Sequence, residues 1–79
     1  MQPVYPSLAR RRGKEGVVLL RISISETGQL TRLEVLEDPG YGFAEAAQEA
    51  VRGSSFTPAH HNGKPVAVLA TLPIRFNLR

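Results

Sequence analysis

The residues whose types and spacing come closest to a reactive site are His60 and His61, with Ser54 and Ser55 a few residues before them. Neighbouring residues of an extended segment point to opposite sides, so two adjacent histidines rarely bind one metal ion, and no third ligand is near in sequence. A serine hydrolase also needs a base and an orienting acid, and nothing here completes that set. We therefore expect an exposed loop with no metal site, no cofactor and no enzymatic activity.

The composition narrows the chemistry further. The 79 residues contain no cysteine, which excludes disulfides, cysteine-ligated zinc and thiol catalysis. With 42% hydrophobic and 22% charged residues, the range 1–79 is typical of one small globular domain. No apolar run approaches the ~20 residues that span a bilayer, and no secretory signal is recognisable.

Basic residues cluster near the start of the chain, at Arg10, Arg11, Arg12 and Lys14, and the net charge is +3. Such a run raises affinity for nucleic acid, so a small basic nucleic-acid-binding module is the alternative function. The aromatic residues fall on expected loop, helix or core positions, however, and leave no exposed platform on which bases could stack. We favour a solvated helix end whose arginines complement the helix dipole, and expect no nucleic-acid partner.

The elements that position these residues follow from the spacing of apolar side chains. Residues 1–15 predict an N-terminal segment with a short helix, and 16–37 predict a β-hairpin that turns at Gly28. Residues 42–53 repeat apolar side chains with helical spacing and predict an amphipathic helix. Strict alternation then returns in 65–78, which predicts the last strand, and a loop connects it to the helix.

These elements predict an α+β fold. The hairpin makes the first two strands antiparallel neighbours, and the helix returns the chain so that the third strand lies beside the first. The expected sheet is three-stranded and antiparallel, in the order 2-1-3, and both helices cover the face on which the apolar residues gather.

Pro73 interrupts the longest alternating stretch and has no N–H for a sheet ladder. Proline inside a sheet is confined to edge strands, with its nitrogen turned away from the neighbour. By the two-residue period, the backbone groups of Ala67, Leu69, Thr71 and Arg75 face the same way. An open edge of this kind accepts a visiting peptide or a second copy of the chain. Proline also protects edges from aggregation, so on this strand alone both interpretations remain open.

Seven short motifs occur in one order along nearly the whole chain, each weak by itself. They are Tyr5-Pro6 with Ala9, Gly16-Val17, the Gly28 turn, the alanine-rich helix, Phe56-Thr57-Pro58-Ala59, Asn62-Gly63-Lys64-Pro65-Val66 and Pro73-Ile74-Arg75-Phe76. Together they make the chain resemble the C-terminal domain of TonB, the periplasmic energy transducer of Gram-negative bacteria. In one departure, Ser54 stands where the family usually has tryptophan or another large residue.

The resemblance implies the same three-stranded fold and adds a function. Domains of this family receive the TonB box of outer-membrane transporters for siderophores, haem or vitamin B12 as an extra strand, and also contact the transporter plug. The resemblance also implies a periplasmic location. It implies inner-membrane anchoring and contact with an ExbB/ExbD-type complex through parts absent from this chain. A homodimer through the last strand is a further expectation. The implied partner-binding residues are Gln2, Pro3, Tyr5, Pro6, Val66, Ala67, Val68, Leu69, Ala70, Thr71, Pro73 and Arg75.

Overall fold

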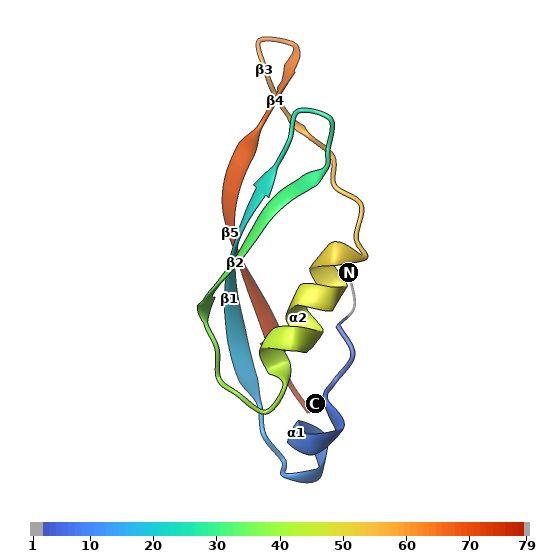
Figure 1. The fold of residues 1–79 in the computed structure, drawn as a ribbon, viewed down its shortest axis with the longest axis vertical. Coiled ribbons are helices and arrows are strands. Elements are labelled where there is room, and N and C mark those ends of the chain that lie inside the picture. The colour runs from blue at the N-terminus through green and yellow to red at the C-terminus, as the bar shows by residue number, and fades with distance from the viewer. Residues whose placement is uncertain (1–2, 79) are drawn as a thin grey trace.

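The computed structural model describes residues 3–78, which form two helices and five strands (Figure 1). In chain order these are α1 (Ser7–Arg11), β1 (Gly16–Ile24), β2 (Leu30–Glu37), α2 (Phe43–Arg52), β3 (Ala59–His61), β4 (Lys64–Val66) and β5 (Val68–Phe76). The molecule is elongated, with extents of 48 × 19 × 18 Å. The helix α1 lies at one end of the long axis and the β3–β4 hairpin at the other (Figure 1).

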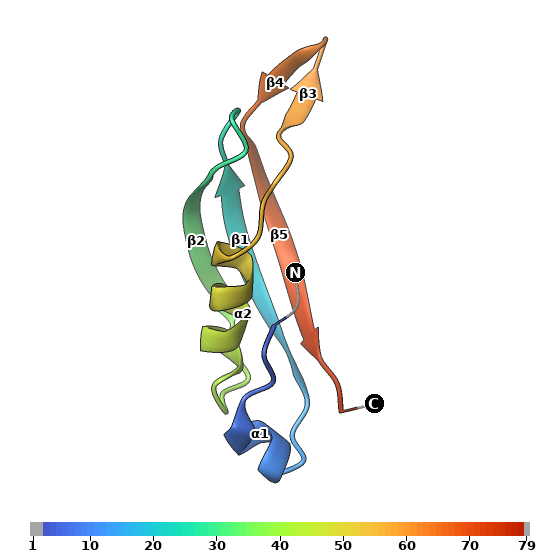
Figure 2. The same cartoon turned by 90° about the vertical axis from the view of Figure 1, so that its right-hand side faces the viewer.

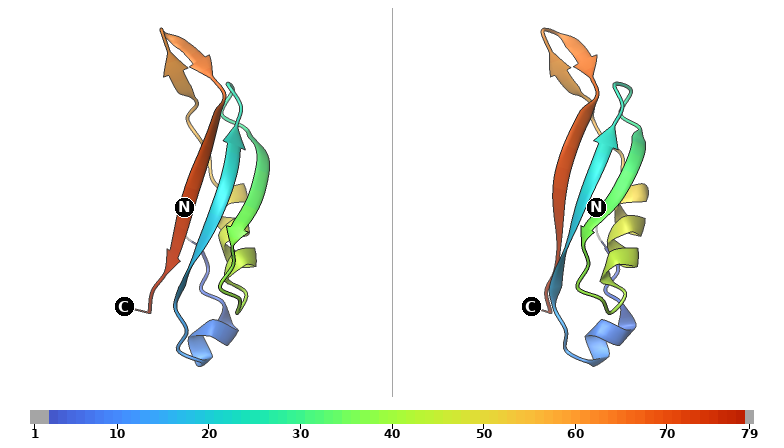
Figure 3. Two further views of the ribbon diagram at one scale, coloured as in Figure 1. Left: turned by 90° about the vertical axis from the view of Figure 1, so that its left-hand side faces the viewer. Right: turned by 60° about the vertical axis from the view of Figure 1, so that its left-hand side comes forward.

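The main sheet has the strand order β2-β1-β5, and both strand pairs are antiparallel. This confirms the predicted α+β fold and the predicted order 2-1-3, in which β5 is the third strand. Pairing between β1 and β5 is continuous, from Gly16 opposite Phe76 to Ile24 opposite Val68. The three strands run along the long axis, and β5 lies at one side of the sheet (Figure 3). Within residues 3–78, β5 therefore pairs on one side only.

The core lies on one face of this sheet, beneath the helices (Figure 2). Alternate residues of β1 point to that face, as its burial pattern shows. The α2 helix ends at Arg52 and is followed by its C-cap, Gly53. Its small Ala44 and Ala47 bring it close to the sheet, and α1 adds the buried Ala9. The buried residues are Ala9, Val18, Leu20, Ile22, Ile24, Phe43, Ala44, Ala47, Val51, Ile74 and Phe76. The α2 helix thus covers the face on which apolar side chains were expected, whereas α1 lies at the end of the sheet and adds only Ala9 to the core (Figure 2).

The last strand differs from its predicted bounds of 65–78. The range 59–66 forms the β3–β4 hairpin, and the main-sheet strand begins at Val68 and ends at Phe76. Asn62 and Gly63 form the hairpin turn with φ of 53° and 78°, the positive values that a tight hairpin loop requires. The strand changes partner at Ala67, which belongs to neither ladder. Side-chain alternation alone does not reveal this change, because it continues through the break.

A close approach at Gly28 holds the β1–β2 turn against the segment that leads to β3. A Cβ added there would lie 2.5 Å from the carbonyl oxygen of Phe56, and φ is +84°. Gly63 also has a positive φ, +78°, but open space around it, and is a matched control. Gly63→Ala is expected to cost about 1–2 kcal/mol through φ alone, and Gly28→Ala about 1–3 kcal/mol more through the clash. Urea unfolding measures both, and equal losses would contradict the contact.

Candidate functional site

The two edges of the main sheet differ in regularity. The β2 ladder with β1 shifts register between Leu19 and Leu20 and again between Ser23 and Ile24. Such bulges twist an edge away from new partners. The β5 ladder has no shift over its nine residues. The β5 edge is therefore the more regular of the two and the better template for a new strand.

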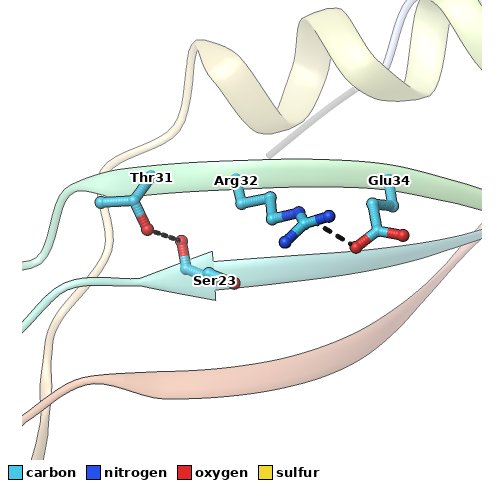
Figure 4. Close-up of polar contacts among 4 residues, drawn as sticks. All are labelled: Ser23, Thr31, Arg32 and Glu34. Atoms are coloured by element: carbon cyan, nitrogen blue, oxygen red, sulfur yellow. Dashed lines mark hydrogen bonds and ion pairs between the residues drawn. The ribbon is translucent and has the colours of Figure 1, made fainter.

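Charged side chains also occupy the β2 edge. The Nε of Arg32 lies 3.2 Å from a carboxylate oxygen of Glu34, on the sheet face away from the helices (Figure 4). Thr31, an extra residue at one register shift, donates a 3.2 Å side-chain hydrogen bond to the carbonyl oxygen of Ser23 (Figure 4). Exposed charges of this kind add little stability but oppose pairing with another strand.

Pro73 determines which backbone groups face outward from β5. It lies directly opposite Leu19 in the antiparallel ladder. Opposed residues either exchange two hydrogen bonds or none, and a residue without N–H fits the second kind. The carbonyl of Pro73 then points to the open edge, as do the backbone groups of Leu69, Thr71 and Arg75. Two outward-facing N–H groups, those of Leu69 and Thr71, therefore follow one another on β5 before the interruption at Pro73.

Exposure along β5 changes from one end to the other. Ile74 and Phe76, at its C-terminal end, are buried beneath the helices. At the β4 end, Leu69 is 66% exposed and Ala70 is also exposed. An added strand could therefore cover apolar surface at the β4 end, beside the unbroken donors. Val66 and Ala67, which the sequence places in the same strand, lie outside β5.

The N-terminal segment occupies a different place from the outward-facing part of β5. Tyr5 packs edge-on against Phe43 and Phe76, with ring centroids 5.6 and 5.8 Å away, and its hydroxyl donates to the carbonyl oxygen of Lys14. Tyr5 is half-buried and Pro6 lies beside Gly42. Of the other expected contacts, Pro3 is half-buried, and Gln2 lies outside the described residues. The segment thus approaches the buried end of β5.

Burial against its aromatic neighbours raises the pKa of Tyr5 above its ordinary value of 10.0; the charge of Glu15 acts in the same direction, and Arg10 opposes both. A raised pKa favours folding at neutral pH, and this contribution is lost as pH rises through the raised value. The stability advantage of the native protein over Tyr5→Phe should therefore shrink above about pH 10. Urea unfolding of both proteins at neutral and alkaline pH measures it. A pH-independent difference would contradict this environment.

Two features were not predicted from the sequence. Phe43 and Phe76, with ring centroids 4.7 Å apart, connect α2 to β5 and form the surface on which the Tyr5 ring packs. An open groove of about 710 Å³ lies beside α2, between Val4 and Ser54. The Ser54 hydroxyl donates to the carbonyl oxygen of Ala50 at 2.7 Å. The small residue at position 54, noted as a departure from the family pattern, was the one signal of this groove.

The histidines and the basic cluster lie apart from the β5 edge. His60 and His61 are exposed on β3, opposite Pro65 and Lys64. Residues 3–78 contain no group of three or more His, Cys, Asp or Glu side chains arranged to hold a metal ion. The arginine cluster lies on α1 and the turn after it. No helix in the described part of the chain is long and apolar enough to cross a membrane.

Comparison with known proteins agrees with the resemblance seen in the sequence. The family model for the Gram-negative bacterial TonB protein C-terminal region matches residues 1–78. Protein TonB of Vibrio cholerae is 37% identical over 79 residues, covering 99% of this chain and 32% of that protein. Protein tonB2 of Pseudomonas aeruginosa is 39% identical over 77 residues, covering 96% of this chain and 28% of that protein. The chain thus spans about a third or less of these two relatives.

A solved structure shows the same fold. The solution NMR structure of the Pseudomonas aeruginosa TonB CTD superposes with a TM-score of 0.80 at 34% sequence identity. The match covers 99% of this chain and 80% of that one.

Proposed function

This chain belongs to the family of Gram-negative bacterial TonB protein C-terminal domains, and from this premise we propose that it binds the TonB box of outer-membrane transporters. The observation that carries the proposal is the open β5 edge, which is regular over nine residues and pairs on one side only within residues 3–78. The box peptide adds along this edge as a fourth strand. No catalytic step is part of this function.

The stretch Val68–Leu72 is the proposed pairing segment. It offers the outward backbone groups of Leu69 and Thr71 and the exposed Leu69 side chain. Each backbone hydrogen bond contributes a net ~0.5–1.5 kcal/mol, so about four or five of them with some apolar burial give roughly micromolar affinity. Such binding is weak enough to release after each transport cycle. Pro73 ends the unbroken ladder and so limits the register of the visiting strand.

The proposed role is transmission of force from the inner membrane. Force applied parallel to paired strands loads their hydrogen bonds together, which suits a domain that pulls on a transporter plug. The energy would come from an ExbB/ExbD-type complex, through an inner-membrane anchor and periplasmic linker in the longer protein. The imported substrates would be siderophores, haem or vitamin B12. We place the domain in the periplasm on the same grounds.

The same edge offers a second copy of the chain a place to pair. Two β5 strands aligned edge to edge would bury the donors that a peptide needs. Self-association and peptide binding should therefore compete. Sedimentation at increasing protein concentration, with and without peptide, measures this competition; added peptide that leaves a dimer intact would contradict it.

Calorimetric titration with a synthetic N-terminal peptide of a TonB-dependent transporter tests the function. We expect saturable one-to-one binding in the micromolar range. The control is the same peptide with prolines at alternate positions, which cannot donate along a ladder and should not bind. Equal affinity for both peptides would overturn strand addition, and no binding of either would overturn the proposed function.

A further inference from the structure

The end of the molecule that carries α1 combines a cluster of basic side chains with exposed apolar side chains. Arg10, Arg11, Arg12 and Lys14 are all exposed there. Among residues 3–78 the single ion pair joins Arg32 and Glu34 on β2, so none of these four cations has a carboxylate partner in the described structure. We call this surface the basic end, defined by Leu8, Arg10, Arg11, Arg12, Lys14 and Tyr41.

Apolar side chains are exposed at the same place. Leu8 on α1 is 44% exposed and Tyr41, before α2, is 38% exposed. The Lys14 ammonium lies 5.5 Å from the centre of the Tyr41 ring, which places the aromatic residue beside one of these cations. The Arg10 guanidinium lies similarly over the Tyr5 ring, 5.6 Å from its centre. Of the four cations, Arg11 and Arg12 are thus the two without an aromatic contact in the described residues.

Two of the acidic groups near this end are hydrogen-bonded within the fold. A carboxylate oxygen of Glu15 accepts the N–H of Leu78 at 2.8 Å. A carboxylate oxygen of Asp38 accepts the N–H of Gly40 at the same distance. Both bonds hold the carboxylates against the backbone of the domain, whereas the cations extend into solvent.

We propose that the basic end docks on the surface of a bilayer that contains anionic phospholipids. Cations alone would suit any polyanion, but exposed leucine and tyrosine side chains beside them also need an apolar medium. Long basic side chains reach headgroup phosphates while their neighbours enter the acyl boundary. The basic end is separate from the pairing segment Val68–Leu72, so docking on a bilayer leaves the β5 edge available. This inference does not depend on the proposed function.

Vesicle co-sedimentation of the folded domain tests the proposal. The vesicles contain phosphatidylglycerol and phosphatidylcholine in equal parts, with pure phosphatidylcholine for comparison. We expect at least about tenfold tighter binding to the anionic vesicles at low salt, and loss of at least about tenfold in Arg11→Glu/Arg12→Glu. Lys14→Glu, outside α1, should weaken binding even if the double variant disturbs that short helix. Leu8→Ala should weaken it by about threefold.

The matched control is Arg52→Glu/Lys64→Glu, which makes the same charge change on α2 and β4. It should retain affinity within about twofold. An equal loss in this control would mean attraction to net charge alone and would overturn the proposal. Equal binding to heparin, or no effect of Leu8→Ala, would assign the basic end to soluble polyanions instead. The peptide titration should be unchanged in Arg11→Glu/Arg12→Glu, which separates this site from the β5 edge.

Discussion

Thr71→Pro is expected to lower affinity for the transporter peptide by at least about tenfold while the domain remains folded. The substitution removes an outward donor and, with Pro73, leaves Leu69 as the only outward N–H before Arg75. One lost hydrogen bond accounts for ~0.5–1.5 kcal/mol, and the proline ring also blocks close approach of the visiting strand. Because the lost N–H faces away from β1, the ladder inside the domain is preserved.

The matched control is one residue away. Ala70 lies opposite Ile22 in the β1–β5 ladder, and its N–H points inward. Ala70→Pro therefore removes an internal donor and should cost about 3 kcal/mol in unfolding free energy. Calorimetric titration and urea unfolding of both variants separate the two effects. If Thr71→Pro destabilised the domain as much as Ala70→Pro, the proposed direction of the backbone groups would be wrong.

Phe43→Ala is expected to cause the largest loss of stability. The Phe43 side chain is fully buried, begins α2, and contacts both Tyr5 and Phe76. Truncation of a buried phenylalanine costs about 3–5 kcal/mol. A domain of this size has little stability to spare, so much of the variant should be unfolded at room temperature. Circular dichroism during urea unfolding measures the loss.

Phe56 provides the comparison for this prediction. It is the same residue type, half-buried at the edge of the core beside Gly28. Phe56→Ala should cost clearly less than Phe43→Ala, because less apolar surface returns to water. Equal losses would contradict the central place of the Tyr5, Phe43 and Phe76 cluster.

Much of the fold could be predicted because the spacing of apolar residues and the positions of turn-forming residues indicate the same elements. Alternation identified β1 and β2, helical spacing identified α2, and Pro73 placed the last strand at an edge. The β3–β4 hairpin was missed although Asn62-Gly63 is a strong hairpin signal. Its strands have three residues each, which is too short for an alternating pattern to be recognised. The change of pairing partner at Ala67 also leaves the alternation of side chains unbroken.

The sequence predicted that the candidate site lies on the open edge of the last strand, but not the β2 bulges or the packing of Tyr5. Pro73 alone was enough to predict which alternate residues of β5 turn their backbone groups toward the open edge. The bulges of β2, which set its edge apart from that of β5, depend on cross-strand register that a single strand's pattern does not contain. The inward packing of Tyr5 depends on two phenylalanines that lie 38 and 71 residues further along the chain. Such tertiary contacts have no local sequence signal.

The central claim is that a transporter peptide pairs with the free side of β5. Amide NMR spectra of the domain, recorded during titration with the peptide, test it most directly. We predict the largest shifts and new protection from hydrogen exchange at Leu69 and Thr71, with β2 unchanged. Shifts confined to β2 or to the basic end, with the β5 amides unaltered at saturation, would contradict it.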